Sequence, residues 1–584
     1  MRKPFNTITI LCFLLCIVLS VCAFPVFAEE AETLRSGDCY YQLLEGGGAR
    51  IIYYSTAATD LTVPDEVAGH PVREIGEYAF TTAFELSSVS LPNGLESIGD
   101  YAFYGLDSLI SVSLPEGLES IGDYAFGYCD SLPSIALPEG LKSIGDRVFY
   151  GCESLASVVL PDSLSSIETN PFVWCSSLED IIISADHPTL ALTDGTLYDK
   201  DSMTLISHLQ TASANAFAVP EDVVAIGDNA FDSCYSLTSI TFPEGLQSIG
   251  NFAFTGCASL DSVSLPNSLT SIGTNPFLGC DSLSTIFVSA DNPSLAQIEG
   301  VLYDKASKTL ISYPVGNQAR TFTVPEGIVA IGAYALNGVY LTSVTFPESL
   351  QSIGDSAFSS CYLLTSVSLP DSLRSLGNSA FFACSELASV SLSAGLQSIG
   401  DSAFRQCDSL TSITLPEGLE SIGNRVFDSC RSLASVSFPE GLQSIGEYAF
   451  WGCSSLNSVA LSEGLQSIGE YAFWGCSSLN FVVLPEGLQS IGRGAFESCS
   501  SLNSVVLPEG LQSIGSSAFG SCSSLISVSL PESLASIGIN AFSGCSDSLS
   551  LVVPSGSYAW NYAIDNEMPY TLSDASGSND WLYS

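Results

Sequence analysis

The chain has 584 residues, and its 62 acidic residues against 16 Lys and Arg give a formal net charge of −46 at pH 7. A surface this acidic repels nucleic acid and anionic lipid, so no nucleic-acid partner is expected. The three histidines do not join any recurring Ser or Asp arrangement, so we expect neither enzyme activity nor a cofactor.

Residues 1–28 are expected to be a secretory signal peptide. Two basic residues precede an apolar stretch from Ile8 to about Val21, and Ala28 offers a cleavage position. The stretch is too short for a membrane anchor, and lipidation at Cys22 is the alternative. We therefore expect a secreted or cell-surface protein with no membrane span after signal removal. Without these 28 residues the chain has 14 basic and 62 acidic residues, which gives a formal charge near −48.

Residues 29–71 are expected to form an N-terminal β-hairpin cap. Two β-rich runs, CYYQLLE and ARIIYYS, flank three consecutive glycines at positions 46–48. A hairpin there would cover the apolar face that the first coil of a repeat protein leaves open.

Region 72–553 repeats a unit centred on an Ile-Gly dipeptide. Nearly every step is 23 residues, one is 22 and two are 59, and the repeat Ile or Leu stands at Ile75, Ile98, Ile121, Ile144, Ile167, Ile226, Ile249, Ile272, Ile331, Ile353, Leu376, Ile399, Ile422, Ile445, Ile468, Ile491, Ile514 and Ile537. A fixed period of this length predicts a solenoid. Residues 441–463 and 464–486 differ at only three positions, which indicates that one coil was duplicated.

One coil is predicted to contain a strand, a turn, an extended Ser-Ile-Gly segment and a short helical turn. Apolar residues alternate with small ones from Leu456 to Leu461, which indicates a half-buried strand. Glu447, like Asp100 and other acidic or Asn residues at this position, would cap a helical turn formed by Tyr-Ala-Phe. One coil buries too little to fold alone, so coils should stack and pair their strands in parallel.

The pattern LPEGLQSIGEYAFWGCSSLNSV, assembled from neighbouring copies, resembles the BspA-type leucine-rich repeat of bacterial and protist surface proteins. The resemblance implies a leucine-rich-repeat solenoid, a β-rich α/β fold with a parallel β-sheet, short helical turns and 18 coils of about 23 residues. It also implies adhesion to host matrix proteins and co-aggregation, with a protein or glycan partner on a host or neighbouring cell surface. The family supplies no catalytic residues to transfer.

The two 59-residue steps mark insertions near 179–220 and 284–325. They contain the related segments DGTLYDKDSMTLIS and EGVLYDKASKTLIS, each of which predicts a hairpin that protrudes from the solenoid. Such hairpins would be spacers or contact elements. Residues 554–572 break the repeat and are expected to be a C-terminal cap, and the Ser-, Gly- and Asp-rich residues 573–584 to be disordered.

Fifteen cysteines, from Cys129 to Cys545, stand eight residues after the repeat Ile or Leu. One thiol per coil does not give the converging ligands of a metal site, and parallel side-chain vectors disfavour disulfides. We expect reduced, buried thiols. A column of glutamates that includes Glu440 and Glu463 would hold Ca²⁺ only weakly, because calcium sites converge about six oxygens. No metal site is expected.

Candidate partner-binding residues lie in the two duplicated coils: Tyr448, Trp451, Tyr471, Trp474 and Phe481. Exposed aromatic residues are typical binding anchors, but Tyr and Trp also pack between coils. Phe481 interrupts a column in which most coils place Ser on the outward side of the strand. The leading hypothesis is a binding or adhesion protein. Its rivals are a passive structural spacer or envelope component without a specific ligand, and a carbohydrate-active enzyme.

Overall fold

A computed structural model describes residues 32–167, 169–211 and 215–573. The expected signal peptide and residues 574–584 of the expected tail lie outside the described residues. The chain divides into two compact units, Met1–Ser166 with Ile182–Ser184, and Ile167–Ile181 with Ala185–Ser584. Each unit is a stack of coils, and each coil contributes one short strand to each of two parallel ladders.

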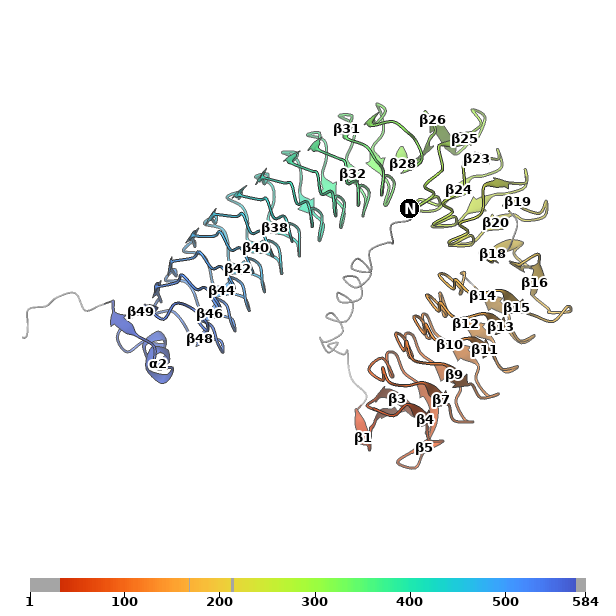
Figure 1. Ribbon diagram of the computed structural model, residues 1–584, viewed down its shortest axis with the longest axis horizontal. Coiled ribbons are helices and arrows are strands. Elements are labelled where there is room, and N and C mark those ends of the chain that lie inside the picture. Colours follow the sequence, from red (N-terminus) through yellow and green to blue (C-terminus); the bar gives the residue numbers. More distant parts are fainter. Residues whose placement is uncertain (1–31, 168, 212–214, 574–584) are drawn as a thin grey trace, which may run out of the picture. The chain divides into compact units, whose positions relative to one another are not determined.

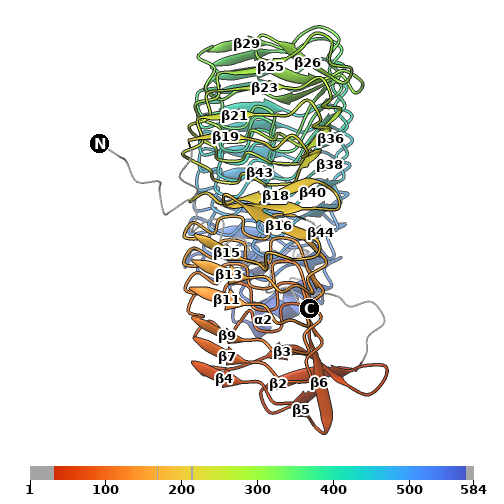
Figure 2. The ribbon, with the colours of Figure 1, turned by 90° about the vertical axis from the view of Figure 1, so that its right-hand side faces the viewer.

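The first ladder, here the main ladder, contains the strand expected in each repeat. In the first unit β4, β7, β9 and β11 stack in one column (Figure 2). Its strands are β4 (Asp60–Thr62), β7 (Ser88–Ser90), β9 (Ser111–Ser113), β11 (Ser134–Ala136) and β13 (Ser157–Val159) in the first unit, β15 (Asp180–Ile182) with residues in both, and β19 (Ala216–Ala218), β21 (Ser239–Thr241), β23 (Ser262–Leu265), β25 (Thr285–Val288), β29 (Thr321–Thr323), β31 (Ser343–Thr345), β33 (Ser366–Ser368), β35 (Ser389–Ser391), β37 (Ser412–Thr414), β39 (Ser435–Ser437), β41 (Ser458–Ala460), β43 (Phe481–Val483), β45 (Ser504–Val506), β47 (Ser527–Ser529), β49 (Ser550–Val553) and β50 (Tyr570–Leu572) in the second.

The second ladder, here the Ser-Ile ladder, is formed by the segment expected to be extended. Strands β38, β40, β42, β44 and β46 are successive rungs of it (Figure 1). Its strands are β6 (His70–Ile75), β8 (Ser97–Ile98), β10 (Ser120–Ile121) and β12 (Ser143–Ile144) in the first unit, β14 (Ser166–Ile167) with residues in both, and β20 (Ala225–Ile226), β22 (Ser248–Ile249), β24 (Ser271–Ile272), β30 (Ala330–Ile331), β32 (Ser352–Ile353), β34 (Ser375–Leu376), β36 (Ser398–Ile399), β38 (Ser421–Ile422), β40 (Ser444–Ile445), β42 (Ser467–Ile468), β44 (Ser490–Ile491), β46 (Ser513–Ile514) and β48 (Ser536–Ile537) in the second.

Identical repeat positions pair across neighbouring coils, because the 23-residue period sets the register. Ile445 pairs with Ile468 in the Ser-Ile ladder, and Val459 pairs with Val482 in the main ladder. Strand β41 is shorter than the expected Leu456–Leu461, because the Leu456 amide closes a turn onto the Cys453 carbonyl at 3.0 Å. The parallel-sheet solenoid is confirmed. Insertions and end segments add rungs, so it has somewhat more turns than 18.

The prediction of a helical turn after the Ser-Ile-Gly segment is wrong. Tyr448 has a φ of +56°, which a right-handed helix excludes, and the Tyr-Ala-Phe segment is a hydrogen-bonded turn. The acidic or Asn residue before it does not cap its own turn. Asn424 Oδ1 accepts the Glu447 amide of the next coil at 2.9 Å, and Asp100 Oδ1 accepts the Asp123 amide at 2.8 Å. These side chains therefore link coils to one another.

The core of each unit is a set of columns, one residue per coil. Phe450 and Phe473 stack with ring centroids 5.1 Å apart, and their neighbours continue the column. Backbones also touch at the repeat glycine, since a Cβ on Gly469 would lie 2.6 Å from the carbonyl carbon of Gly446. The Ile-Gly dipeptide thus combines a buried side chain with a close approach of successive coils.

The insertions do not protrude as expected. The first consists of β16 (Leu190–Thr193), β17 (Thr196–Asp199) and β18 (Thr204–His208), and the second of β26 (Leu295–Ile298), β27 (Val301–Asp304) and β28 (Thr309–Ser312). Each forms antiparallel pairs, and its last strand pairs in parallel with the next Ser-Ile strand, as Leu205 does with Ile226 and Leu310 with Ile331. The hairpins are therefore built into the Ser-Ile ladder, where apolar residues such as Leu197, Leu205, Leu302 and Leu310 are buried.

At the N-terminal end, β1 (Leu34–Ser36), β2 (Cys39–Leu43) and β3 (Ala49–Tyr54) are antiparallel, and β5 (Glu66–Val67) pairs with β6. Strand β3 lies parallel to β6, with Ile51 beside Ile75. At the other end, α2 (Tyr558–Asp565) is followed by β50, which pairs with β49. Ser557 caps α2 by accepting the Trp560 amide at 3.1 Å.

Candidate interaction surfaces

Four of the five candidate residues form two parallel aromatic stacks on the turn that follows the Ser-Ile strand. Trp451 and Trp474 stack with centroids 5.0 Å apart and planes 7° apart, and Tyr448 and Tyr471 stack at 5.2 Å and 20°. Within each coil the turn joins the two stacks, because the Trp amide donates to the Tyr carbonyl at 3.1 Å. All four side chains are half-buried. We call these four residues the aromatic turn stack.

Both outer faces of the tyrosine pair are covered. The Arg425 guanidinium lies 4.8 Å from the Tyr448 ring, and that of Arg493 lies 5.6 Å from the Tyr471 ring. The Tyr471 ring also lies over Gly494, where a Cβ would collide with it. Burial raises the pKa of the Tyr448 hydroxyl, and the Tyr471 neighbour adds to this, so the phenol stays neutral. A partner therefore meets the edges of the tyrosine rings.

An ion pair lies in the column that leads to the tryptophans. Asp428 is one coil before Trp451, and its Oδ2 lies 2.9 Å from Arg405 Nε one coil earlier again. Burial raises the pKa of the Asp428 carboxyl, while Arg405 partly offsets this. Arg405 also lies over the Phe382 ring at 5.8 Å. The tryptophans thus continue a column whose members already interact from coil to coil.

Phe481 lies apart from these rings, on strand β43 of the main ladder, beside Ser458. Its side chain is 55% exposed. Sequence reasoning missed three exposed apolar neighbours of Phe481. Val483 follows in β43, Val506 stands at the same position one coil later, and Ile526 donates its amide to Asn503 at 2.9 Å. These four residues, Phe481, Val483, Val506 and Ile526, are called the strand patch below.

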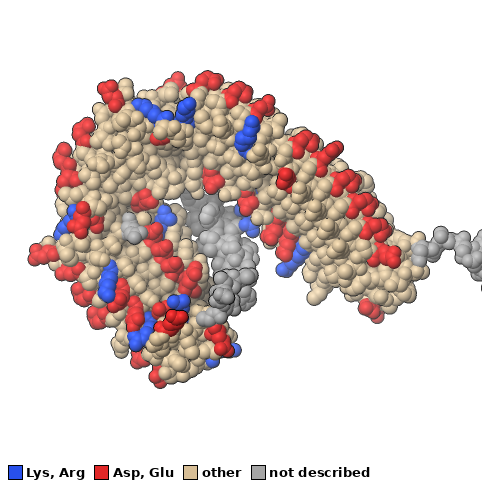
Figure 3. Space-filling view, turned by 180° about the vertical axis from the view of Figure 1, so that it is seen from behind, with Lys and Arg blue, Asp and Glu red and all other residues tan. Residues whose placement is uncertain are grey.

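In the second unit the charged side chains lie away from the outward strand positions of the main ladder. From β31 to β49 the outward residues are Ser, Thr, Ala, Val and Phe, with no formal charge among them. Acidic side chains instead gather in rows with wide uncharged areas between them (Figure 3). Several rows lie in turns, as shown by Glu509 Oε2, which accepts the Glu532 amide at 3.3 Å.

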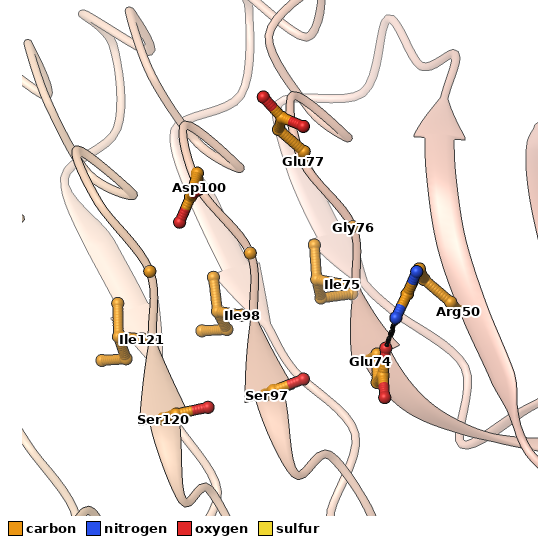
Figure 4. A pocket seen from close by; sticks show the side chains of 12 residues that line it. Arg50, Glu74, Ile75, Gly76, Glu77, Ser97, Ile98, Asp100, Ser120 and Ile121 are labelled. Atoms are coloured by element: carbon orange, nitrogen blue, oxygen red, sulfur yellow. Dashed lines mark hydrogen bonds and ion pairs between the residues drawn. The ribbon is translucent and has the colours of Figure 1, made fainter. Parts of the chain in front are cut away.

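The first unit carries a shallow groove of about 290 Å³ along the Ser-Ile ladder (Figure 4). Ile75, Ile98 and Ile121 form a row there, and Arg50 Nε donates to Glu74 Oε2 at 2.6 Å. Its lining includes neither a histidine nor a cysteine.

A family model for the BspA type leucine rich repeat region matches residues 53–192, 207–314, 315–434 and 420–549. The chain belongs to the BspA-type leucine-rich repeat family. The resemblance inferred from the repeats is thereby confirmed. Proteins of this family are typically surface-associated, and their solenoids are typically non-enzymatic scaffolds.

Solved structures similar to this BspA-type chain include three bacterial leucine-rich repeat proteins. A leucine rich cell surface protein from Faecalibacterium prausnitzii is 27% identical, covering 78% of this chain and 95% of its own, with a TM-score of 0.32. A protein from Bacteroides ovatus is 22% identical over 92% and 99%, with a TM-score of 0.25. The T. pallidum leucine rich repeat protein is 27% identical over 43% and 91%, with a TM-score of 0.25. No curated protein matches.

Two of the three histidines of this BspA-type chain, His187 and His208, have structural partners. His187 Nδ1 accepts the Leu190 amide at 3.0 Å, as Asn292 Oδ1 accepts the Leu295 amide in the second insertion. His208 takes the place of the column phenylalanine and lies 2.7 Å from Thr196 Oγ1. Across residues 32–167, 169–211 and 215–573, no three His, Cys, Asp or Glu side chains are placed to hold a metal, and no helix is long and apolar enough to cross a bilayer.

Proposed function

We propose that this protein is a secreted or cell-surface adhesion protein that binds a macromolecular partner through its repeat surface. The observation that carries the proposal is the aromatic turn stack of the duplicated coils. Two tryptophans and two tyrosines are packed side by side and remain half-exposed on a strongly acidic chain. Rigid aromatic side chains of this kind lose little entropy on binding and are enriched among binding anchors.

The fold itself does not require the tryptophans. The position of Trp451 is occupied by Gly520 and Ser543 in later coils, which form the same backbone ladders. The main-chain bond from Gly452 to the Trp474 carbonyl, at 2.7 Å, has a counterpart in the bond from Ser521 to the Ser543 carbonyl at 2.6 Å. A passive spacer would need no such side chains, so the stack favours a binding function.

A protein partner fits the turn stack better than a sugar. Sugars bind aromatic residues by lying flat on a ring face, but the faces of Tyr448 and Tyr471 are covered by each other and by Arg425 and Arg493. Ring edges carry partial positive charge and suit carbonyl and carboxylate oxygens. We therefore favour a protein on the surface of a host or neighbouring cell.

The test is a pull-down with the folded protein from extracellular-matrix and cell-surface extracts. The proposal expects saturable capture of a defined partner, whose affinity is then measured by surface plasmon resonance with the purified partner. A matched Trp451→Ser, Trp474→Ser variant, which carries the Ser of position 543, should lose most of the capture. Absence of any saturable partner across matrix proteins and cell surfaces would favour the passive spacer.

A further inference from the structure

We propose that the strand patch binds an extended cationic amphipathic segment of a partner protein, in which apolar side chains alternate with Lys or Arg. This inference rests on the proposed function and adds a second contact surface, on the main ladder, to the aromatic turn stack. No ring of the turn stack stands in contact with Phe481 among the described residues, so the two surfaces can be tested separately.

Four large apolar side chains stand exposed on three neighbouring coils. The exposed fractions are 55% for Phe481, 44% for Val483, 72% for Val506 and 53% for Ile526. Strands β45 and β47 pair directly, with Val506 beside Ser529, and β43 is the neighbour of β45. From β31 to β41 the positions equivalent to Phe481 and Val483 hold Ser, Thr or Ala, as in Ser435 and Ser437 of β39. A group of exposed apolar residues on neighbouring coils marks an interaction surface more often than isolated residues do.

Polar groups border the apolar centre on one side. Asn457, Asn480 and Asn503 precede the strands and are exposed, and the hydroxyls of Ser458 and Ser504 lie beside Phe481 along the column. An apolar centre with a hydrogen-bonding rim is the usual anatomy of a protein interface. The pleat of a partner strand would place every second side chain on the patch, and the long Lys or Arg side chains between them would bend back along the strand edge.

A row of carboxylates borders the other side. Glu463, Glu486, Glu509 and Glu532 are exposed, and each stands three residues after the outward strand residue of its coil. None of the four forms an ion pair within the part of the chain that the structure describes. Since the patch itself is uncharged, charge complementarity assigns the partner an apolar strip with a cationic edge.

The experiment measures binding of a fluorescently labelled synthetic peptide of alternating Leu and Lys to the purified protein by anisotropy. A Ser-Lys peptide keeps the charge without the apolar strip, and a Leu-Glu peptide keeps the strip with the opposite charge. Val506→Ser removes the most exposed side chain of the strand patch. Phe287→Ser is the matched control, because Phe287 is 53% exposed on β25 of the same ladder but stands away from the patch.

The expected result is binding of the Leu-Lys peptide alone, weakened about tenfold or more by Val506→Ser and unchanged by Phe287→Ser. A Glu486→Gln, Glu509→Gln variant should weaken binding and flatten its salt dependence, while Glu244→Gln, Glu417→Gln should not. Equal affinity of the Val506→Ser variant, or equal binding of the Ser-Lys peptide, would overturn the inference. If partner capture still depends on Trp451 and Trp474, the proposed function survives that failure.

Discussion

The Sγ of Cys476 donates a hydrogen bond to the main-chain carbonyl of Phe450, 26 residues earlier, at 3.3 Å. The same bond links the column cysteine of most coils to the phenylalanine of the coil before, for example Cys453 to Phe427 at 3.2 Å. Burial raises the pKa of the Cys453, Cys476 and Cys522 thiols, to about 12 for Cys522. The column is thus a structural feature that suppresses thiolate formation. No disulfide links the cysteines of the described residues, and only Cys545 of the column is not fully buried.

The column thiols should resist labelling in the native protein. Ellman's reagent or iodoacetamide at pH 8 should leave them largely unmodified, because both reagents need an accessible thiolate, and denaturant should release the whole set. Cys545, at the end of the column, should react first. Rapid native modification of Cys257 or Cys453, located by peptide mass spectrometry, would contradict a buried column.

Adding one methyl group at a repeat glycine should destabilise the stack. In Gly469→Ala the new Cβ would meet the backbone of Gly446 in the coil before, so the coils must separate locally. We expect a loss of about 1–3 kcal/mol in the free energy of unfolding, seen as a lower urea midpoint. Ser477→Ala, at an exposed position, should change the midpoint little. A Gly469→Ala midpoint as high as that of wild type would refute backbone contact at this position.

His208 should make the first insertion sensitive to acid. Burial lowers its pKa to about 4, against 6.5 in the unfolded chain, so below about pH 6.5 the unfolded state binds a proton that the folded state does not. The stability that depends on the neutral ring is present above pH 6.5 and falls by at most about 1.4 kcal/mol per pH unit between 6.5 and 4. Hydrogen exchange of β18 should follow this fall. In a His208→Phe, Thr196→Val variant the exchange of the β18 amides should lose this dependence on pH. If the variant keeps the pH profile of the wild type, His208 is excluded as the source of the dependence.

Deleting residues 38–71 should fray the first coils. The deletion removes β3, whose Ile51 carbonyl accepts the Gly76 amide at 2.7 Å and whose side chains cover the Ile75 column. Exposed apolar coil ends aggregate or exchange rapidly. Size-exclusion chromatography and hydrogen exchange over β6 and β8 measure this. A monomeric truncation with wild-type protection would show that the segment is not a cap.

The repeat made the ladder register and the buried columns predictable, because one residue type per coil at a fixed step leaves a single way to stack. The local turn was not predictable in the same way. Asn424 would be a suitable helix cap and is an equally suitable acceptor for the next coil, since both roles need a short side chain with an oxygen at the same position. Only the φ of Arg425, +56°, separates the two roles, because it excludes a right-handed helical turn after Asn424.

The candidate surfaces, like the local turn, could be predicted only in part from the sequence. Trp451 and Trp474 stand out because they break a column, and so does Phe481. Val506 does not stand out in the sequence, because Val at a strand position is typical of a buried residue. Its side chain is 72% exposed because it lies on the outward side of the strand. The strand patch spans three outward columns, so no single column of the repeat indicates it. The insertions resembled protrusions because sequence does not show which strand their last segment will join.

The central claim, binding through the repeat surface, is tested most directly by the affinity of a captured partner for three variants: Trp451→Ala, Trp474→Ala and Phe481→Ser. Circular dichroism and thiol protection confirm that each variant is folded. Removing an anchor from a binding surface typically costs about 2 kcal/mol, so we expect affinity to fall about thirtyfold in at least one tryptophan variant. Wild-type affinity in all three folded variants would contradict the account and remove these coils as the binding surface.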